Sequence, residues 1–273
     1  MTKIKLPIRD SIFSHVKCSS LVGEPKLFDW DRGNNNSKDY IFLTDSHVHM
    51  VDLFSDKKKY AWLLESPDIE SVAHEFVKNN PDKFDLIFTS RKDILSNVNH
   101  SKFLVFGSCW INYEDRGLHL ESKDKLVSMV SSGKSMTTGH NLRNNIANLY
   151  KNNIDLFGRA FNPIDNKITS LKDYMFQIVV ENNKSDYYFT EKLIDCLQTG
   201  VIPIYWGCPS IGDFFDVNGI LSFDTMEDLE KIISTLSKEL YLSKKESIKT
   251  NFEKSKIYTI AEDYLMDNYS EFL

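Results

Sequence analysis

Residues 181–207, ENNKSDYYFTEKLIDCLQTGVIPIYWG, decide the fold class of this chain. They continue an apolar, strand-like run and predict a loop, a helix and a second strand. Thr190 is a favourable N-cap residue, Glu191 in the first turn suits the helix dipole, and Gly200 suits the end of the helix. The apolar run 201–206 is typical of a strand that is covered on both faces, as in a parallel sheet.

The same alternation of strands and helices extends through most of the chain. Short apolar runs predict strands at 40–44, 60–64, 84–89, 103–106, 154–157, 176–180 and 201–206. Helical patterns predict helices at 69–78, 121–130, 142–151, 191–199 and 226–237. Alternation of this kind predicts an α/β fold with parallel sheets.

The length of the chain, 273 residues, is typical of about two domains. The polar stretch SSGKSMTT at 131–138 predicts the boundary, with a first domain of residues 1–135 and a second of residues 136–273. Two such halves would hold a ligand cleft between them. The alternative is one doubly wound domain with a surface loop at this position. Apolar residues at helical spacing in 257–273 predict a last helix.

Composition excludes several classes of protein. The net charge of −6 argues against a protein that coats nucleic acid. Apolar runs fall well short of the roughly 18 residues that span a bilayer, and the N-terminus lacks the apolar core of a signal peptide. The four cysteines form no CxxC pair, which favours a reducing compartment and predicts a cytoplasmic protein.

The opening stretch resembles the C-terminal signature of the family 10 glycosyltransferases, the α-1,3/α-1,4-fucosyltransferases. That signature is a strand ending in F-E-N, then Y-x-T-E-K-[LI], a short helix, and V-P-[IV]-x-x-G. The chain has VEN at 180–182, YFTEKL at 188–193 and IPIYWG at 202–207, in wording closest to the bacterial members. Three upstream segments are similar to further family segments: AWLLESP at 61–67, FDLIFTSRKD at 84–93 and GHNLRNNIANL at 139–149.

The resemblance implies a GT-B fold, which consists of two Rossmann-like domains with a cleft between them. The first domain would lie on the acceptor side, and the second would bind the nucleotide sugar. The resemblance also implies that the last helix, in 257–273, crosses back to the first domain, with packing on its own domain as the alternative. The implied activity is that of an inverting glycosyltransferase, which moves fucose from GDP-fucose, or the sugar of a related GDP-sugar, to a hydroxyl group of a glycan acceptor. The GDP-sugar is then the donor substrate, and no divalent metal or other cofactor is expected.

The resemblance also implies roles for a base and two cations. Glu65 matches the general base that takes the proton of the acceptor, and its alternative role is to cap a helix that starts near Pro67. Arg143 and Lys192 match the cations that bind the donor diphosphate. Without the resemblance, Arg143 would be an exposed helix arginine and Lys192 a solvated helix lysine.

Three more residues match positions at the donor site. Glu191 matches the carboxylate that accepts hydrogen bonds from the ribose hydroxyls, and Tyr188 matches an aromatic residue beside the donor. Asn182 either completes donor binding or holds the loop before Tyr188. Arg91 matches a family arginine, for which an ion pair with Asp93 or Glu65 is the alternative to a catalytic role.

Other features of the sequence point to different functions. The H-x-H pair His47 and His49, with Asp45 or Asp52 nearby, is how several metal-dependent hydrolases begin a metal site. The D-x-D at 29–31 matches the metal-binding motif of GT-A glycosyltransferases, but it lies in a polar stretch and is frequent by chance. A non-catalytic protein that binds a nucleotide sugar or a glycan is a third possibility.

Overall fold

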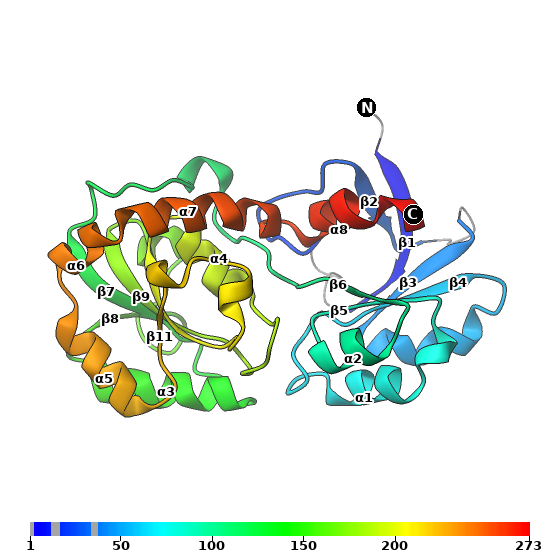
Figure 1. The fold of residues 1–273 in the computed structure, drawn as a ribbon, viewed down its shortest axis with the longest axis horizontal. Coiled ribbons are helices and arrows are strands. Elements are labelled where there is room, and N and C mark those ends of the chain that lie inside the picture. The colour runs from blue at the N-terminus through cyan, green and yellow to red at the C-terminus, as the bar shows by residue number, and fades with distance from the viewer. Residues whose placement is uncertain (1–2, 12–16, 34–37) are drawn as a thin grey trace.

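A computed structural model describes residues 3–11, 17–33 and 38–273 and shows two α/β halves, each built on one sheet (Figure 1). The first sheet has the strand order β2-β1-β3-β4-β5-β6, and the second has the order β11-β10-β9-β7-β8. All described strand pairings in both sheets are parallel. The predicted α/β fold with two parallel sheets is therefore confirmed.

The first half covers its sheet with helices on one face and with the C-terminal helix on the other. Its strands are β1 (Ile4–Arg9), β2 (Phe28–Asp31), β3 (Tyr40–Thr44), β4 (Lys58–Trp62), β5 (Leu86–Thr89) and β6 (Ser101–Phe103). Ile41 and Leu43 of β3 pack with α1 (Ser71–Asn79), α2 (Lys92–Asn97) and the 3-10 helix Asp45–Leu53. Phe42 points to the opposite face, because successive side chains of a strand alternate between faces.

The second half is also a sheet between two helical layers. Its strands are β7 (Lys125–Val130), β8 (Asp155–Phe157), β9 (Tyr174–Val180), β10 (Ile202–Trp206) and β11 (Leu221–Ser222). One core contains residues of α3 (Thr138–Tyr150), α5 (Met226–Thr235), α6 (Lys238–Ser243) and α7 (Lys245–Ser255). The other core contains residues of α4 (Glu191–Leu197). Among the described residues, no helix combines the length and the apolar content needed to cross a membrane.

The last helix, α8 (Ala261–Tyr269), lies on the first half, although the helices before it belong to the second. Ala261 and Leu265 are buried in the same core as Phe42. Figure 1 shows the path, with α7 leading across the molecule to α8. The chain therefore passes between the halves twice, once before β7 and once before α8.

The structure corrects the prediction of a helix at 121–130. Residues 125–130 form β7, which pairs with β8 and β9 in the second sheet. The apolar residues at 126, 127, 129 and 130 are compatible with a helix or with a buried strand. Pairing with the neighbouring strands β8 and β9 decides in favour of the strand. Because β7 belongs to the second sheet, the second half begins before the predicted boundary at residue 136. Strands β1 and β2 were not expected from the sequence.

Candidate functional site

A cavity of about 920 Å³ lies between the two halves. All six site residues proposed from the sequence line it, and they are Glu65, Arg143, Asn182, Tyr188, Glu191 and Lys192. Glu65 comes from the first half, and the other five come from the second. Ser19, Trp110 and Lys167 also line the cavity.

The topology of the second sheet explains why these side chains converge. The strands are parallel, so their carboxyl ends meet at one edge, where α3 and α4 begin. Helix α3 starts so close to the end of β9 that a Cβ atom at Gly139 would lie 1.8 Å from the carbonyl oxygen of Glu181. A glycine is required at this position, and it brings Arg143, one turn later, to the end of β9.

Arg143 is buried at this edge, with 7% of its surface exposed. Its Nη2 donates to Oδ1 of Asn182 at 2.6 Å, and its Nε donates to the carbonyl oxygen of Gly139 at 3.3 Å. Burial lowers the pKa of Arg143, but a guanidinium remains charged at neutral pH. The alternative of an exposed helix arginine is therefore wrong.

Lys192 lies among oxygen atoms at the start of α4. Its Nζ lies 3.0 Å from Oε1 of Glu191, 3.1 Å from Oγ1 of Thr190 and 3.8 Å from Oε2 of Glu181. Thr190 is the N-cap residue, as predicted, because its hydroxyl accepts the backbone N–H of Lys192. Glu181 in turn accepts both the N–H and the hydroxyl of Thr190, at 2.9 and 2.7 Å. Lys192 is not a freely solvated helix lysine.

Glu191 is a buried carboxylate that remains ionised. Burial alone would raise its pKa, but Lys192 and Lys167 together lower the pKa below its usual value. Lys167 also forms an ion pair with the buried Asp195, and its Nζ lies 5.5 Å from the centre of the Trp110 ring. Sequence reasoning missed Lys167 and Asp195, because the two lie 28 positions apart and no local pattern links them.

Glu65 follows β4 and faces the second half across the cavity. Burial raises its pKa and Glu191 adds to this effect, whereas Lys192 opposes it. Burial raises the pKa of Tyr188, and the charge of Glu65 adds to this effect. The alternative of a helix cap at Glu65 is wrong, because α1 begins only at Ser71.

Arg91 lies outside the cavity. It forms ion pairs with Asp93 and Glu75, which supports the structural alternative rather than contact with a substrate. The pair His47 and His49 lies in the 3-10 helix that follows β3, and the ring of His49 packs on Phe76 at 4.4 Å. No three His, Cys, Asp or Glu side chains within the described residues are grouped as a metal site would need.

The D-x-D at 29–31 lies in the strand β2 at the edge of the first sheet, and not in a loop. Asp29 forms ion pairs with Lys3 and Lys5. Asp31 accepts the backbone N–H of Gly33 at 2.9 Å. The asparagine run that follows this motif lies outside the described residues.

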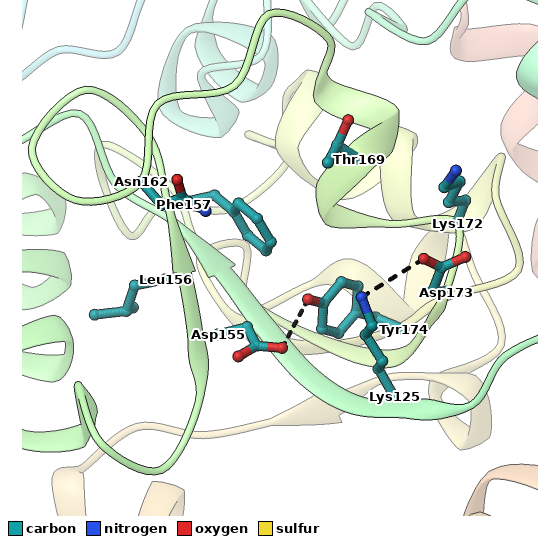
Figure 2. Close-up of a pocket in the computed structure, with 9 residues that line it drawn as sticks. All are labelled: Lys125, Asp155, Leu156, Phe157, Asn162, Thr169, Lys172, Asp173 and Tyr174. Carbon is teal, nitrogen blue, oxygen red and sulfur yellow. Dashed lines mark hydrogen bonds and ion pairs between the residues drawn. The ribbon is translucent and has the colours of Figure 1, made fainter.

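A second hollow, of about 450 Å³, opens at the amino ends of β7, β8 and β9. Figure 2 shows two pairs among its polar groups: the hydroxyl of Tyr174 donates to Asp155 at 2.7 Å, and Lys125 faces Asp173 at 3.7 Å. Ligands of open α/β sheets bind at the carboxyl ends of the strands. The cavity between the halves, and not this hollow, is therefore the candidate site.

Comparison with known proteins identifies the family. Residues 120–265, more than half of the chain, match the model for the C-terminal part of glycosyltransferase family 10 (fucosyltransferase). The chain belongs to glycosyltransferase family 10. The family match covers β7 to α8 and contains every site residue except Glu65.

Curated relatives match shorter segments of the family 10 chain. An alpha-(1,3)-fucosyltransferase of Helicobacter pylori is 36% identical over 85 residues, which cover 29% of this chain and 18% of the relative. A GDP-fucose protein O-fucosyltransferase 3 of Gallus gallus is 32% identical over 115 residues, which cover 36% of this chain and 24% of the relative. The matched segments thus span less than a quarter of either relative.

Solved structures match nearly the whole family 10 chain. An alpha1,3-fucosyltransferase with GDP has a TM-score of 0.56 at 16% identity, and the match covers 96% of this chain and 93% of the chain in that structure. TarM has a TM-score of 0.58 at 14% identity, and the match covers 86% of this chain and 55% of the TarM chain. These matches and the two parallel sheets confirm the predicted GT-B fold of two Rossmann-like halves.

Proposed function

We propose that this chain is an inverting fucosyltransferase that transfers fucose from GDP-fucose to a hydroxyl group of a glycan acceptor. Family membership supports transfer of a sugar from a nucleotide donor. The observation that carries the proposal is the composition of the cavity. A carboxylate of raised pKa from one half, Glu65, faces two cations from the other half, Arg143 and Lys192.

The proposed reaction is a single displacement at the anomeric carbon. Glu65 takes the proton of the acceptor hydroxyl, and the acceptor oxygen forms the new glycosidic bond. The bond between the anomeric carbon and the phosphate oxygen breaks on the opposite face, and GDP leaves with its additional negative charge. Attack and departure on opposite faces invert the anomeric configuration, and the base contributes about 10²–10⁴-fold to such a reaction.

The groups around the donor have distinct proposed roles. Arg143 offers a planar fork to phosphate oxygens, and Lys192 offers a point charge. Both would stabilise the charge that develops on the leaving diphosphate. The ionised Glu191 would accept hydrogen bonds from the ribose, and Asn182, which binds the guanidinium of Arg143, would hold that cation in place. Independence of a divalent metal stays a prediction.

The proposed location of the protein is the cytoplasm. All four cysteines are buried and unbridged, which agrees with a reducing compartment. A cytoplasmic location stays a prediction that rests on these cysteines.

A nucleotide screen tests the donor. We expect GDP to stabilise the protein by about 2.7 kcal/mol at 100 times its dissociation constant, and UDP and CDP to stabilise it much less. The measurement is thermal unfolding with each nucleotide and its sugars. Equal stabilisation by all nucleotides would contradict a guanine-specific donor site. Release of GDP from GDP-fucose upon addition of candidate glycans then separates an enzyme from a binding protein that does not catalyse transfer.

A further inference from the structure

Two buried side chains hold the backbone of Glu65 from both sides. Oδ1 of Asp45 accepts the backbone N–H of Leu64 at 2.9 Å and that of Glu65 at 3.3 Å. On the other side, Nε2 of His74 lies 2.9 Å from the carbonyl oxygen of Glu65. Asp45 follows β3, His74 belongs to α1, and neither residue lines the cavity.

His74 acts as the donor in its hydrogen bond, because a carbonyl oxygen can only accept. Its side chain is buried, with 1% of its surface exposed, and burial lowers its pKa to about 4. Arg91 adds to this decrease, whereas the carbonyl of Glu65 and the carboxylates of Asp93 and Glu75 oppose it. The imidazole is therefore neutral at pH 7 and carries its hydrogen on Nε2.

Asp45 occupies its position at a cost in free energy. Its φ angle is +44°, in the left-handed region, which aspartate and asparagine enter more readily than other residues that carry a side chain. Its side chain is fully buried, and Oδ2 has no hydrogen-bond partner among the described residues. An apolar residue at this position would avoid the unpartnered oxygen but would leave the backbone N–H groups of Leu64 and Glu65 without their acceptor, Oδ1.

We propose that Asp45 is a positioning residue for sugar transfer, which holds the backbone N–H groups of Leu64 and Glu65 and thereby aims the Glu65 carboxylate into the cavity. His74 holds the carbonyl group of Glu65 and so restrains rotation of the Glu65 backbone. This inference rests on the proposed role of Glu65 as the general base. A base that is displaced by about 1 Å loses on the order of 10²-fold in rate, so loss of the anchor should appear in catalysis before it appears in donor binding.

The test compares Asp45→Ala and Asp45→Asn with Val48→Ala as the matched control. Val48 is fully buried in the same 3-10 helix but packs in the apolar core. We expect Asp45→Ala to lower kcat by about 10-fold or more, with an unchanged KM for GDP-fucose, because the donor lies on the other half. Asp45→Asn keeps an acceptor oxygen and tolerates the left-handed region, so kcat should return to within about 3-fold of the wild type. Val48→Ala should lower the melting temperature and leave kcat unchanged.

A second pair of variants keeps the test valid if Asp45→Ala does not fold. His74→Ala should lower kcat, whereas His74→Gln, whose amide can donate to the carbonyl oxygen of Glu65, should retain more of it. A normal kcat in Asp45→Ala, or an equal loss of kcat in Val48→Ala, would overturn the inference. When Asp45→Ala does not fold, equal kcat values in the two His74 variants would overturn it.

Glu65→Gln separates this inference from the proposed function. If Glu65 is the base, Glu65→Gln is nearly inactive, and adding Asp45→Ala to it lowers the residual rate no further. A fully active Glu65→Gln would remove the base assignment and the anchor with it. An inactive Glu65→Gln beside a fully active Asp45→Ala would remove the anchor alone and leave the proposed function intact.

Discussion

At the residue scale, the proposed mechanism gives Lys192 an influence on both the leaving group and the base. It lies at the start of α4, and its charge opposes the increase in the pKa of Glu65 that burial causes. Loss of this charge would therefore raise the pKa of Glu65 further. Because a base must be deprotonated to accept a proton, the acidic limb of the rate profile follows that pKa.

We predict that Lys192→Ala shifts the acidic limb of kcat/KM to higher pH. The rate on the plateau should also fall, by about 10²–10³-fold, since one donor to the leaving diphosphate is lost. Lys184→Ala is the matched control, because Lys184 is exposed, belongs to the same loop region and does not line the cavity. The measurement is kcat/KM for GDP-fucose across the acidic range. A limb that stays in place or moves to lower pH would show that Lys192 does not control the base.

At the element scale, the start of α4 depends on one hydroxyl group. Thr190 caps the helix and also binds the carboxylate of Glu181, so it fixes the turn that carries Lys192. We predict that Thr190→Ala lowers the free energy of unfolding by about 0.5–2 kcal/mol, as for other N-caps. GDP affinity should fall as well, because Lys192 loses its fixed position. Thr190→Ser, which keeps the hydroxyl, should restore both quantities.

The chain contains a matched control for this prediction. Thr225 caps α5 in a capping box with Asp228, and it does not line the cavity. Thr225→Ala should cost a similar free energy of unfolding without any change in GDP affinity. Urea unfolding and GDP titration give the two quantities. If both threonine variants alter GDP affinity equally, the cap of α4 has no special role at the donor site.

Some elements of the fold are predictable from the sequence and others are not. Helix α4 was predictable because its N-cap and its apolar stripe are adjacent in sequence. The helix ends earlier than predicted, at Leu197 with Gln198 as its C-cap, so Gly200 adopts a positive φ angle in the turn that follows. Strand β7 was not predictable, because its pairing with β9 involves residues some 50 positions away. The donor residues from 182 to 192 form one motif, whereas Asp45, Glu65 and His74 are joined only by the fold.

At the scale of the whole molecule, a buried carboxylate fastens the segment that returns to the first half. Glu262 of α8 accepts the N–H and the hydroxyl of Ser19, at 2.9 and 2.6 Å, and the indole N–H of Trp30 at 3.0 Å. Ser19 lines the cavity, and its carbonyl oxygen accepts the hydroxyl of Ser108 from the other crossing between the halves. One side chain thus joins the cavity wall, the first sheet and both crossings.

We predict that Glu262→Ala lowers the free energy of unfolding by about 3 kcal/mol or more, since it leaves buried donors without an acceptor. Glu262→Gln should cost less, because its amide oxygen can still accept from Ser19 and Trp30. The control is Asp263→Ala, which removes an acceptor for the backbone N–H of Lys26 at a more exposed site and should cost less than Glu262→Ala. Calorimetry distinguishes the outcomes: if α8 holds the halves together, Glu262→Ala should unfold in two steps where the wild type unfolds in one. A single transition at the wild-type temperature would show that the apolar contacts of Ala261 and Leu265 alone suffice to hold α8 in place.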